Sequence, residues 1–286
     1  MVVLMITLDE EISTLYELLT QNNLDFIESA DFTVEDYKEI IGEIYAETIE
    51  GLFLDTNVSA LDNIKRIANQ HVNIYYSDKE ISSGYYIYKK IYINDKLPES
   101  QQIVTIIHEL THHLYAQIFE KWLYRLFNIN KCCIIESLVM FMLNNSIENR
   151  VADEYLSYIV EGRFTPPEYQ NYLSFLQLLM ELGIDVEQSK QFFIFAHEIS
   201  HDIDDMFKPI ISDDLRSSIS NQFVTDDMEV LNQKLTFDYC DERFNEVEKV
   251  EFMQEMIYFI FDYFVNGEGN ISDLENYITE FDMKIK

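Results

Sequence analysis

The chain has 286 residues, of which 20 are Lys or Arg and 52 are Asp or Glu, so its formal net charge at pH 7 is −32. Hydrophobic residues make up 48% and aromatic residues 14% of the sequence. This apolar content is too high for a disordered acidic chain and sufficient for one large domain or two modest ones. The acidic balance argues against a broad surface for nucleic acid or anionic lipid, because phosphate binding needs clustered Lys and Arg. We therefore expect no direct nucleic-acid partner and no membrane partner.

The N-terminal sequence does not predict export. Residues 1–6 are apolar, but they lack a basic flank and are followed closely by Asp9, Glu10 and Glu11, unlike a signal peptide. The apolar stretch at residues 256–265 contains an aspartate and is much shorter than a membrane span. The three cysteines are an odd number and predict no disulfide framework. We expect a cytoplasmic protein.

The first third of the sequence predicts helices followed by a small sheet. Gly and Pro are sparse, with 7 and 4 residues, which favours long helices. Apolar residues recur every three or four positions in three segments, which predicts amphipathic helices at residues 12–19, 34–52 and 60–68. At residue 72 the sequence becomes rich in aromatic and β-branched residues. Short strands are therefore predicted at residues 72–76, 85–88 and 91–93.

A long helix is predicted at residues 101–119, after Pro98, and the chain is then expected to be helical almost to its end. The clearest internal boundary is the Thr-Pro-Pro sequence at residues 165–167. We expect an α+β fold that is mostly α-helical, with the small sheet beside the long helix. The two expected domains are residues 1–164 and residues 165–286.

The sequence His108-Glu109-Leu110-Thr111-His112 is an H-E-x-x-H motif inside the predicted long helix. On a helix, His108 and His112 lie one turn apart on the same face, so both imidazoles can reach one metal ion. Glu109 can then reach a metal-bound water and act as a general base. Neutral imidazole suits Zn²⁺. A metallopeptidase also needs an edge strand beside the metal helix to hold an extended peptide, and residues 91–94 are a candidate.

The segment YYIYKKIYINDKLPESQQIVTIIHELTHHL, residues 85–114, resembles the ImmA/IrrE-type zinc metallopeptidases and their relatives among plasmid antirestriction proteins. The later segment IENRVADEYLSYIVEGRF, residues 147–164, is similar to the second helix of those families. The resemblance implies a zincin core of the gluzincin kind, with His108 and His112 as ligands of Zn²⁺ and Glu109 as the base. It also implies that a downstream Glu is the third ligand and that the substrate is a specific protein, often a regulator.

The third ligand departs from the family pattern. In the family a Glu stands three residues before an Ala, whereas here Asn149 has that position before Ala152 and Glu148 stands four residues before it. Glu148 is our predicted third ligand, and Glu136, which lies alone in an apolar helix, is the alternative. Asp153 is a candidate acceptor for the second ring nitrogen of a ligand histidine. Cys132 or Cys133 as a thiolate ligand is a further alternative, against a role as an inert buried thiol.

A second H-E-x-x-H motif contains His197, Glu198 and His201. No pair of predicted strands precedes it, and acidic residues follow it, so an internal duplication is poorly supported. Besides coincidence, two interpretations are open. The two histidines could form a separate metal site with acids such as Asp205. Alternatively, the two Glu-x-x-His pairs could belong to a ferritin-like di-iron carboxylate bundle, which takes a further Glu from each of two other helices. Those residues would be Glu148 and either Glu43 or Glu47.

The function predicted from the sequence is hydrolysis of peptide bonds by a zinc metallopeptidase. His108, His112 and Glu148 would hold the metal, and Glu109 would take a proton from the attacking water and pass it to the leaving amine. The expected partner is a protein or peptide substrate. A catalytically silent zincin-fold binding protein is the remaining alternative.

Overall fold

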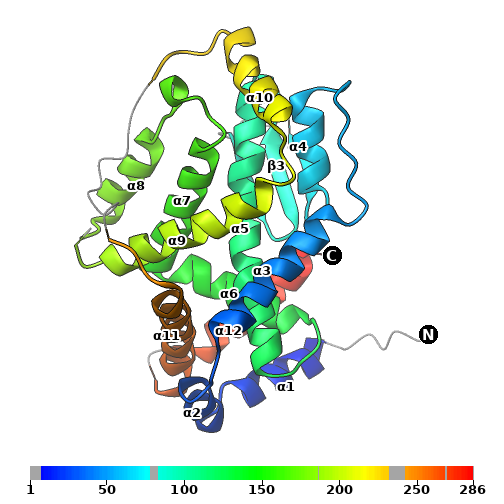
Figure 1. The fold of residues 1–286 in the computed structure, drawn as a ribbon. Helices are drawn as coiled ribbons and strands as arrows, with labels where there is room; N and C mark the ends of the chain where they lie inside the picture. Colours follow the sequence, from blue (N-terminus) through cyan, green and yellow to red (C-terminus); the bar gives the residue numbers. More distant parts are fainter. Residues whose placement is uncertain (1–7, 78–82, 186, 232–241, 268, 286) are drawn as a thin grey trace. The chain divides into compact units, whose positions relative to one another are not determined.

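The computed structural model describes residues 8–77, 83–185, 187–231, 242–267 and 269–285. The described chain is mostly helical with one small sheet, as the sequence predicts (Figure 1). The helices are α1 (Leu8–Leu18), α2 (Gln21–Glu28), α3 (Val34–Ile49), α4 (Ala60–Ala68), α5 (Glu99–Leu126), α6 (Cys133–Asn145), α7 (Ile147–Gly162), η1 (Pro167–Tyr169), α8 (Leu173–Leu182), α9 (Lys190–Phe207), α10 (Asp213–Thr225), α11 (Glu246–Val265) and α12 (Ile271–Ile285). Within the described ranges, no helix combines the length and the apolar composition that crossing a membrane requires.

The chain forms two compact units, and each is assembled from segments that are distant in sequence. The first unit contains Met1–Ile40, Ile118–Ser146 and Asn245–Lys286, and the second contains Ile41–Gln117 and Ile147–Phe244. The boundaries of these compact units differ from the domain boundary that the sequence predicts after residue 164. The assignment of a peptidase domain and a separate C-terminal domain stays a prediction.

The first unit is a set of helices around an aromatic core. α11 packs against α2, and α12 packs against α6. Trp122 is completely buried and meets the ring of Phe32 edge-on, with ring centroids 5.1 Å apart. The side chain of Gln254, on α11, donates hydrogen bonds of 2.8 and 3.0 Å to the carbonyl oxygens of Ile27 and Ala30. These bonds fix α11 to the C-terminal end of α2 and to the residues that follow it.

The second unit contains the sheet. Its strands are β1 (Asn73–Ser77), β2 (Gly84–Ile87) and β3 (Lys90–Asn94), in the order β1-β3-β2. β3 is parallel to β1 and antiparallel to β2. The predicted strands are confirmed to within one or two residues. The prediction that residues 91–94 form an edge strand is wrong, because β3 is central and both of its sides already pair with neighbouring strands.

Tyrosines stabilise the sheet across its strands. Tyr75, Tyr92 and Tyr85 are direct neighbours on β1, β3 and β2, and their rings stack with centroids 5.3 and 4.8 Å apart. Stacked cross-strand aromatic pairs each contribute on the order of 0.5–1 kcal/mol. On β3 the alternate residues Ile91 and Ile93 are completely buried. The alternation explains why a sequence rich in tyrosine and isoleucine forms a sheet with one buried face.

Strand β2 lies against the long helix α5. A Cβ atom built on Gly84 would be 2.6 Å from Cγ2 of Thr105 on α5 and 2.6 Å from the carbonyl oxygen of Tyr92, so only glycine fits there. The hydroxyl of Tyr86, also on β2, is 2.8 Å from Nδ1 of His113 on α5. The edge of the sheet beside the H-E-x-x-H helix is therefore β2 within the described chain.

Candidate metal centre

Helix α5 presents both histidines of the first motif on one face. The rings of His108 and His112 have centroids 4.9 Å apart and an interplanar angle of 78°. Their side chains are only 12% and 11% exposed. The helix is held in place by apolar residues on its other faces, such as Ile106, Leu110 and Leu114, which are almost completely buried. A rigid helix fixes the spacing of the two imidazoles before any ligand binds.

Helix α7 supplies carboxylates to both rings. Oε2 of Glu154 is 3.5 Å from Nε2 of His108, and Oε2 of Glu161 is 2.8 Å from Nδ1 of the same ring. Oδ1 of Asp153 is 2.9 Å from Nδ1 of His112. The side chains of His108, His112 and Glu154 offer ligand atoms that all lie within 4.8 Å of one another. Around a tetrahedral zinc, ligand atoms are about 3.4 Å apart, so small side-chain movements would close this group on an ion.

The arrangement of the Nδ1 atoms is typical of metal-binding histidines. Metal-binding histidines usually donate their other ring N–H to a carboxylate, which fixes the tautomer and the orientation of the ring. Here Glu161 is hydrogen-bonded to Nδ1 of His108, whereas Nδ1 of His112 is 2.9 Å from Oδ1 of Asp153 and 3.2 Å from the hydroxyl oxygen of Ser157. Nε2 is then the remaining nitrogen of each ring for a metal. The contact predicted for Asp153 is present in the structure.

The electrostatics of this group favours positive charge. Burial disfavours the imidazolium form of His108, but hydrogen bonds to Glu154 and Glu161 prevail and raise its pKa well above the usual range. Burial likewise opposes charge on His112, and the Asp153 carboxylate outweighs it and raises the pKa of His112 to about 9. Burial also acts on Glu154, but its hydrogen bond to His108 lowers the pKa of Glu154 to about 2. The ionised carboxylate of Glu154 thus provides a place for a cation.

Glu109 lies beside the metal-binding face. Its residue is 8% exposed, and burial raises the pKa of its carboxyl group, while the charges of His108 and His112 act in the opposite direction. The charges of both imidazoles therefore act on Glu109, and its role as a general base stays a prediction.

The predicted third ligand, Glu148, is not part of this group. It is exposed near the start of α7, six residues before Glu154. Six helical residues turn the side chain by about 600°, roughly 120° short of two full turns, and rise about 9 Å. Glu148 therefore projects from a different face of α7 than Glu154. The signal that indicates Glu154 is its spacing from Glu161, because seven residues are two turns and place both acids on one face.

The alternative ligands belong to the other compact unit. Glu136 is buried in α6, and its Oε1 is 3.8 Å from Nζ of Lys131. Cys133 is at the start of the same helix, where its Sγ is 3.7 Å from Oγ of Ser137. Glu136 is therefore an ion-paired acid and Cys133 is a thiol at a helix terminus, and the structure places neither in the group formed by His108, His112 and Glu154.

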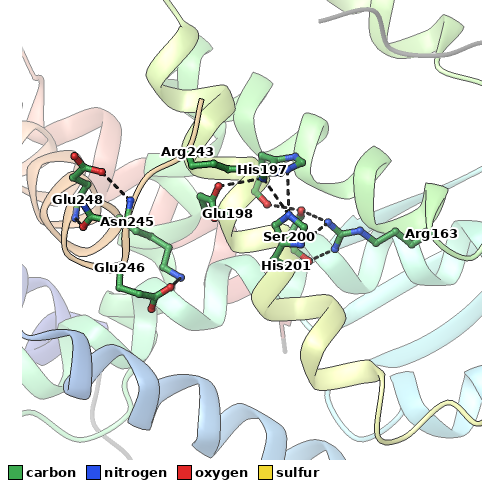
Figure 2. A network of polar contacts seen from close by, with 10 residues as sticks. Arg163, His197, Glu198, Ser200, His201, Arg243, Asn245, Glu246 and Glu248 are labelled. Carbon is green, nitrogen blue, oxygen red and sulfur yellow. Dashed lines mark hydrogen bonds and ion pairs between the residues drawn. The ribbon is translucent and has the colours of Figure 1, made fainter. Parts of the chain in front are cut away.

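The second H-E-x-x-H motif lies on α9, in a different environment. The guanidinium groups of Arg163 and Arg243 both contact His201 (Figure 2). Asp205, which the sequence offers as a further metal ligand, is 68% exposed and 2.5 Å from Nζ of Lys208. Positive guanidinium groups beside His201 oppose binding of a metal cation at this motif.

The di-iron alternative needs inward-facing carboxylates from two further helices. The residues that the sequence offers for this role are all exposed in the structure: Glu43, Glu47 and Glu148. The pair formed by Glu109 and His112 instead faces the carboxylates of α7, including Asp153 and Glu154.

Comparison of the chain with protein-family models, with curated proteins and with solved structures found no match. The resemblance of residues 85–114 to the ImmA/IrrE-type peptidases therefore stays an expectation from the sequence.

Proposed function

We propose that this protein is a zinc-dependent metallopeptidase whose metal is held by His108, His112 and Glu154. The observation that carries the proposal is the convergence of these three side chains within 4.8 Å, with a carboxylate already placed at Nδ1 of both rings. Two His and one Glu are the ligand set of many catalytic zinc sites, which keep one position for water.

Zinc held by His108, His112 and Glu154 would supply a water of lowered pKa and would polarise the carbonyl of the substrate. Glu109 would be the general base, which accepts a proton during the attack and returns it to the leaving amine. Asp153 and Glu161 hold the two imidazoles in the tautomer that directs Nε2 towards the metal.

The edge strand β2 supports a peptide as the substrate. Backbone N–H and C=O groups on the outer side of an edge strand can pair with an extended chain and align it. β2 is fixed to α5 through Gly84 against Thr105 and through Tyr86 against His113, the neighbour of His112. A peptide added to β2 would therefore run beside the helix that carries the metal ligands. We expect the physiological substrate to be a protein or peptide.

Metal analysis separates the ligands from their neighbours. We expect about one zinc per chain in the wild type, and loss of that zinc in His112→Ala and in Glu154→Gln. Glu148→Gln is the matched control on the same helix and should keep the metal. Zinc retained by both His112→Ala and Glu154→Gln would refute this ligand set. Two irons per chain, lost with either His112→Ala or His201→Ala, would support the di-iron alternative instead.

Hydrolysis tests the chemistry separately from the metal. Glu109→Gln should keep one zinc per chain and lose cleavage of a fluorogenic peptide library by a factor of about 100 or more, because the general base is removed. A zinc-loaded Glu109→Gln protein that cleaves as fast as the wild type would refute the mechanism. A zinc-loaded wild type that cleaves no member of the library would favour the silent binding protein.

A further inference from the structure

Three tyrosines on the exposed face of the sheet form a ladder across its strands. Tyr75 on β1, Tyr92 on β3 and Tyr85 on β2 are direct neighbours in the register. The ring centroids are 5.3 Å apart between Tyr75 and Tyr92 and 4.8 Å apart between Tyr92 and Tyr85, with interplanar angles of 22° and 14°. These distances are close to the spacing of hydrogen-bonded strands, about 4.8 Å. The rings therefore stand nearly parallel, one on each strand, and their faces point towards the neighbouring strands.

The ladder ends at the two edges of the sheet. Tyr85 is 39% exposed and Tyr75 is 42% exposed, whereas Tyr92 between them is half-buried. Among the described residues, the only ring that stacks on Tyr85 is that of Tyr92. Because this contact uses one face of the ring, the other face of Tyr85 points away from β3, towards any strand that would be added to β2.

The backbone of β2 places Tyr85 where a partner side chain would come closest. The amide of Asn94 donates a 3.0 Å hydrogen bond to the carbonyl oxygen of Ser83. In an antiparallel pair the hydrogen-bonded positions alternate, so Tyr85 directs its backbone groups to β3, and Gly84 and Tyr86 direct theirs to the outer edge. In a peptide paired antiparallel with Gly84 and Tyr86, the residue opposite Tyr85 would have a non-hydrogen-bonded position, where side chains approach most closely.

The edge formed by β2 is also the one beside the candidate metal helix. Gly84 and Tyr86 lie on the face of β2 that meets α5. Side chains alternate along a strand, so Tyr85 projects from the opposite face, away from α5. A peptide on β2 would present alternate side chains to the tyrosine ladder and to the side of the sheet that carries α5. Tyr75 ends the ladder at β1, on the opposite edge of the sheet.

The charge of the β2–β3 hairpin favours a peptide over a second copy of the chain as the occupant of this edge. Residues 83–94 contain two lysines, Lys89 and Lys90, and no acidic residue, in a chain whose net charge is −32. This net charge makes two copies of the chain repel each other. A short peptide that carries acidic residues is instead complementary to the two lysines.

We infer that the peptide bound at β2 presents an aromatic side chain opposite Tyr85, where it becomes the fourth ring of the ladder. The inference rests on the proposed function, because it describes the substrate of the candidate metal centre as an acidic segment with an aromatic residue. Tyr85 then determines specificity. An aromatic ring that stacks on it gains about threefold to tenfold in affinity over an aliphatic side chain that buries a similar area.

The test compares two peptides that differ at one residue. Both alternate threonine and valine, which favour an extended conformation, and carry an aspartate at each end; the central residue is phenylalanine in one and leucine in the other. Binding of each peptide to the full-length Glu109→Gln protein, in buffer that contains zinc, is measured by isothermal titration calorimetry. The variant is used to keep the peptide intact. We expect the phenylalanine peptide to bind about threefold to tenfold more tightly than the leucine peptide.

Three further substitutions, each made in the Glu109→Gln protein, locate the preference on the ladder. Tyr85→Leu removes the last ring and should bring the two affinities to within about twofold, whereas Tyr85→Phe keeps a ring and should keep the preference. Tyr75→Leu is the matched control, because it also removes one end of the ladder and one stacked pair, but on β1. Equal affinities of the two peptides without these substitutions, or a preference that persists in Tyr85→Leu, would overturn the inference.

Other outcomes separate this inference from the proposed function and from a second copy of the chain. Failure of both peptides to bind at millimolar concentration would also overturn the inference. If the phenylalanine peptide binds through Tyr85 but the zinc-loaded wild type cleaves neither peptide, the result counts against the peptidase and supports the aromatic preference of β2. A dimer that forms with rising concentration and that Tyr85→Leu dissociates, followed by analytical ultracentrifugation, would overturn the inference, because a second copy would then occupy the edge.

Discussion

At the scale of single residues, the neighbours of a histidine pair determine what the pair can bind. Both H-E-x-x-H motifs place two imidazoles one helical turn apart, and the motif itself does not distinguish them. Asp153 and Glu161 take the Nδ1 atoms of the first pair, whereas Arg163 faces an Nδ1 atom of the second. The chemistry therefore depends on residues outside the motif, which lie on or just after α7.

The first prediction concerns the carboxylates that contact Nδ1 of the two candidate ligand histidines. Glu161→Gln should weaken zinc binding about 10- to 100-fold without abolishing it, because the neutral amide polarises the ring of His108 less than a carboxylate does. The affinity can be measured by competition with a chromophoric chelator. Glu148→Gln removes a charge from an exposed position of the same helix and is the control. Equal affinities of Glu161→Gln and the wild type would show that Glu161 does not support the metal.

The lowered pKa of His197 predicts that the stability of the folded protein depends on pH. The pKa of His197 is lowered to about 4, so between pH 6.5 and pH 4 the unfolded chain binds a proton that the folded protein does not. The free energy of unfolding should therefore fall as the pH decreases through this window, by about 1–2 kcal/mol for a half-buried group.

Chemical denaturation at pH 7 and pH 4.5 measures this loss. The His197→Gln variant is the reference, because protonation of every other group is common to both proteins. We expect the wild type to lose more stability than the variant over this range. Parallel losses would mean that His197 titrates normally in the folded protein.

At the scale of elements, the close contact between β2 and α5 fixes the edge strand beside the metal helix. Gly84→Ala should destabilise the protein by about 1–3 kcal/mol, because the added Cβ would be 2.6 Å from the carbonyl oxygen of Tyr92, which cannot rotate away. Gly42→Ala, in α3, is the matched control. A Cβ there meets nothing within 4 Å, and alanine should stabilise the helix by up to about 1 kcal/mol. Thermal unfolding of both variants measures the difference, and equal melting temperatures would refute the close contact.

The elements of the second unit could be read from the sequence, but their arrangement could not. β-Propensity predicts the strands to within one residue and periodicity predicts the start of α5 to within two, because these signals are local, whereas α5 ends at Leu126, seven residues beyond the predicted end. The central position of β3 depends on pairing with β1, and no local signal specifies it. Similarly, the motif indicates His108 and His112, whereas the choice of Glu154 over Glu148 depends on how α7 is rotated against α5.

At the scale of the whole molecule, each compact unit is assembled from segments that are separated in the sequence by segments of the other unit. The first unit takes three separate segments and the second takes two. Every residue of the candidate metal centre belongs to the second unit, in the segments Ile41–Gln117 and Ile147–Phe244. A metal bound at this centre would therefore stabilise contacts between those two segments, because His108, His112 and Glu154 all belong to the second unit.

This organisation predicts that removing the metal increases hydrogen exchange more in the second unit than in the first. A ligand that binds only the folded state stabilises the region that forms its site, so a chelator should lower the protection of that region most. In hydrogen exchange followed by mass spectrometry, we expect chelation to speed exchange in α7 and in the part of α5 that ends at Gln117. Peptides from α6, α11 and α12 should change less, since they supply no ligand. The His112→Ala variant, with and without chelator, is the control for effects of the chelator itself. A wild type whose exchange rises equally in both units would show that the two units open as a single cooperative structure.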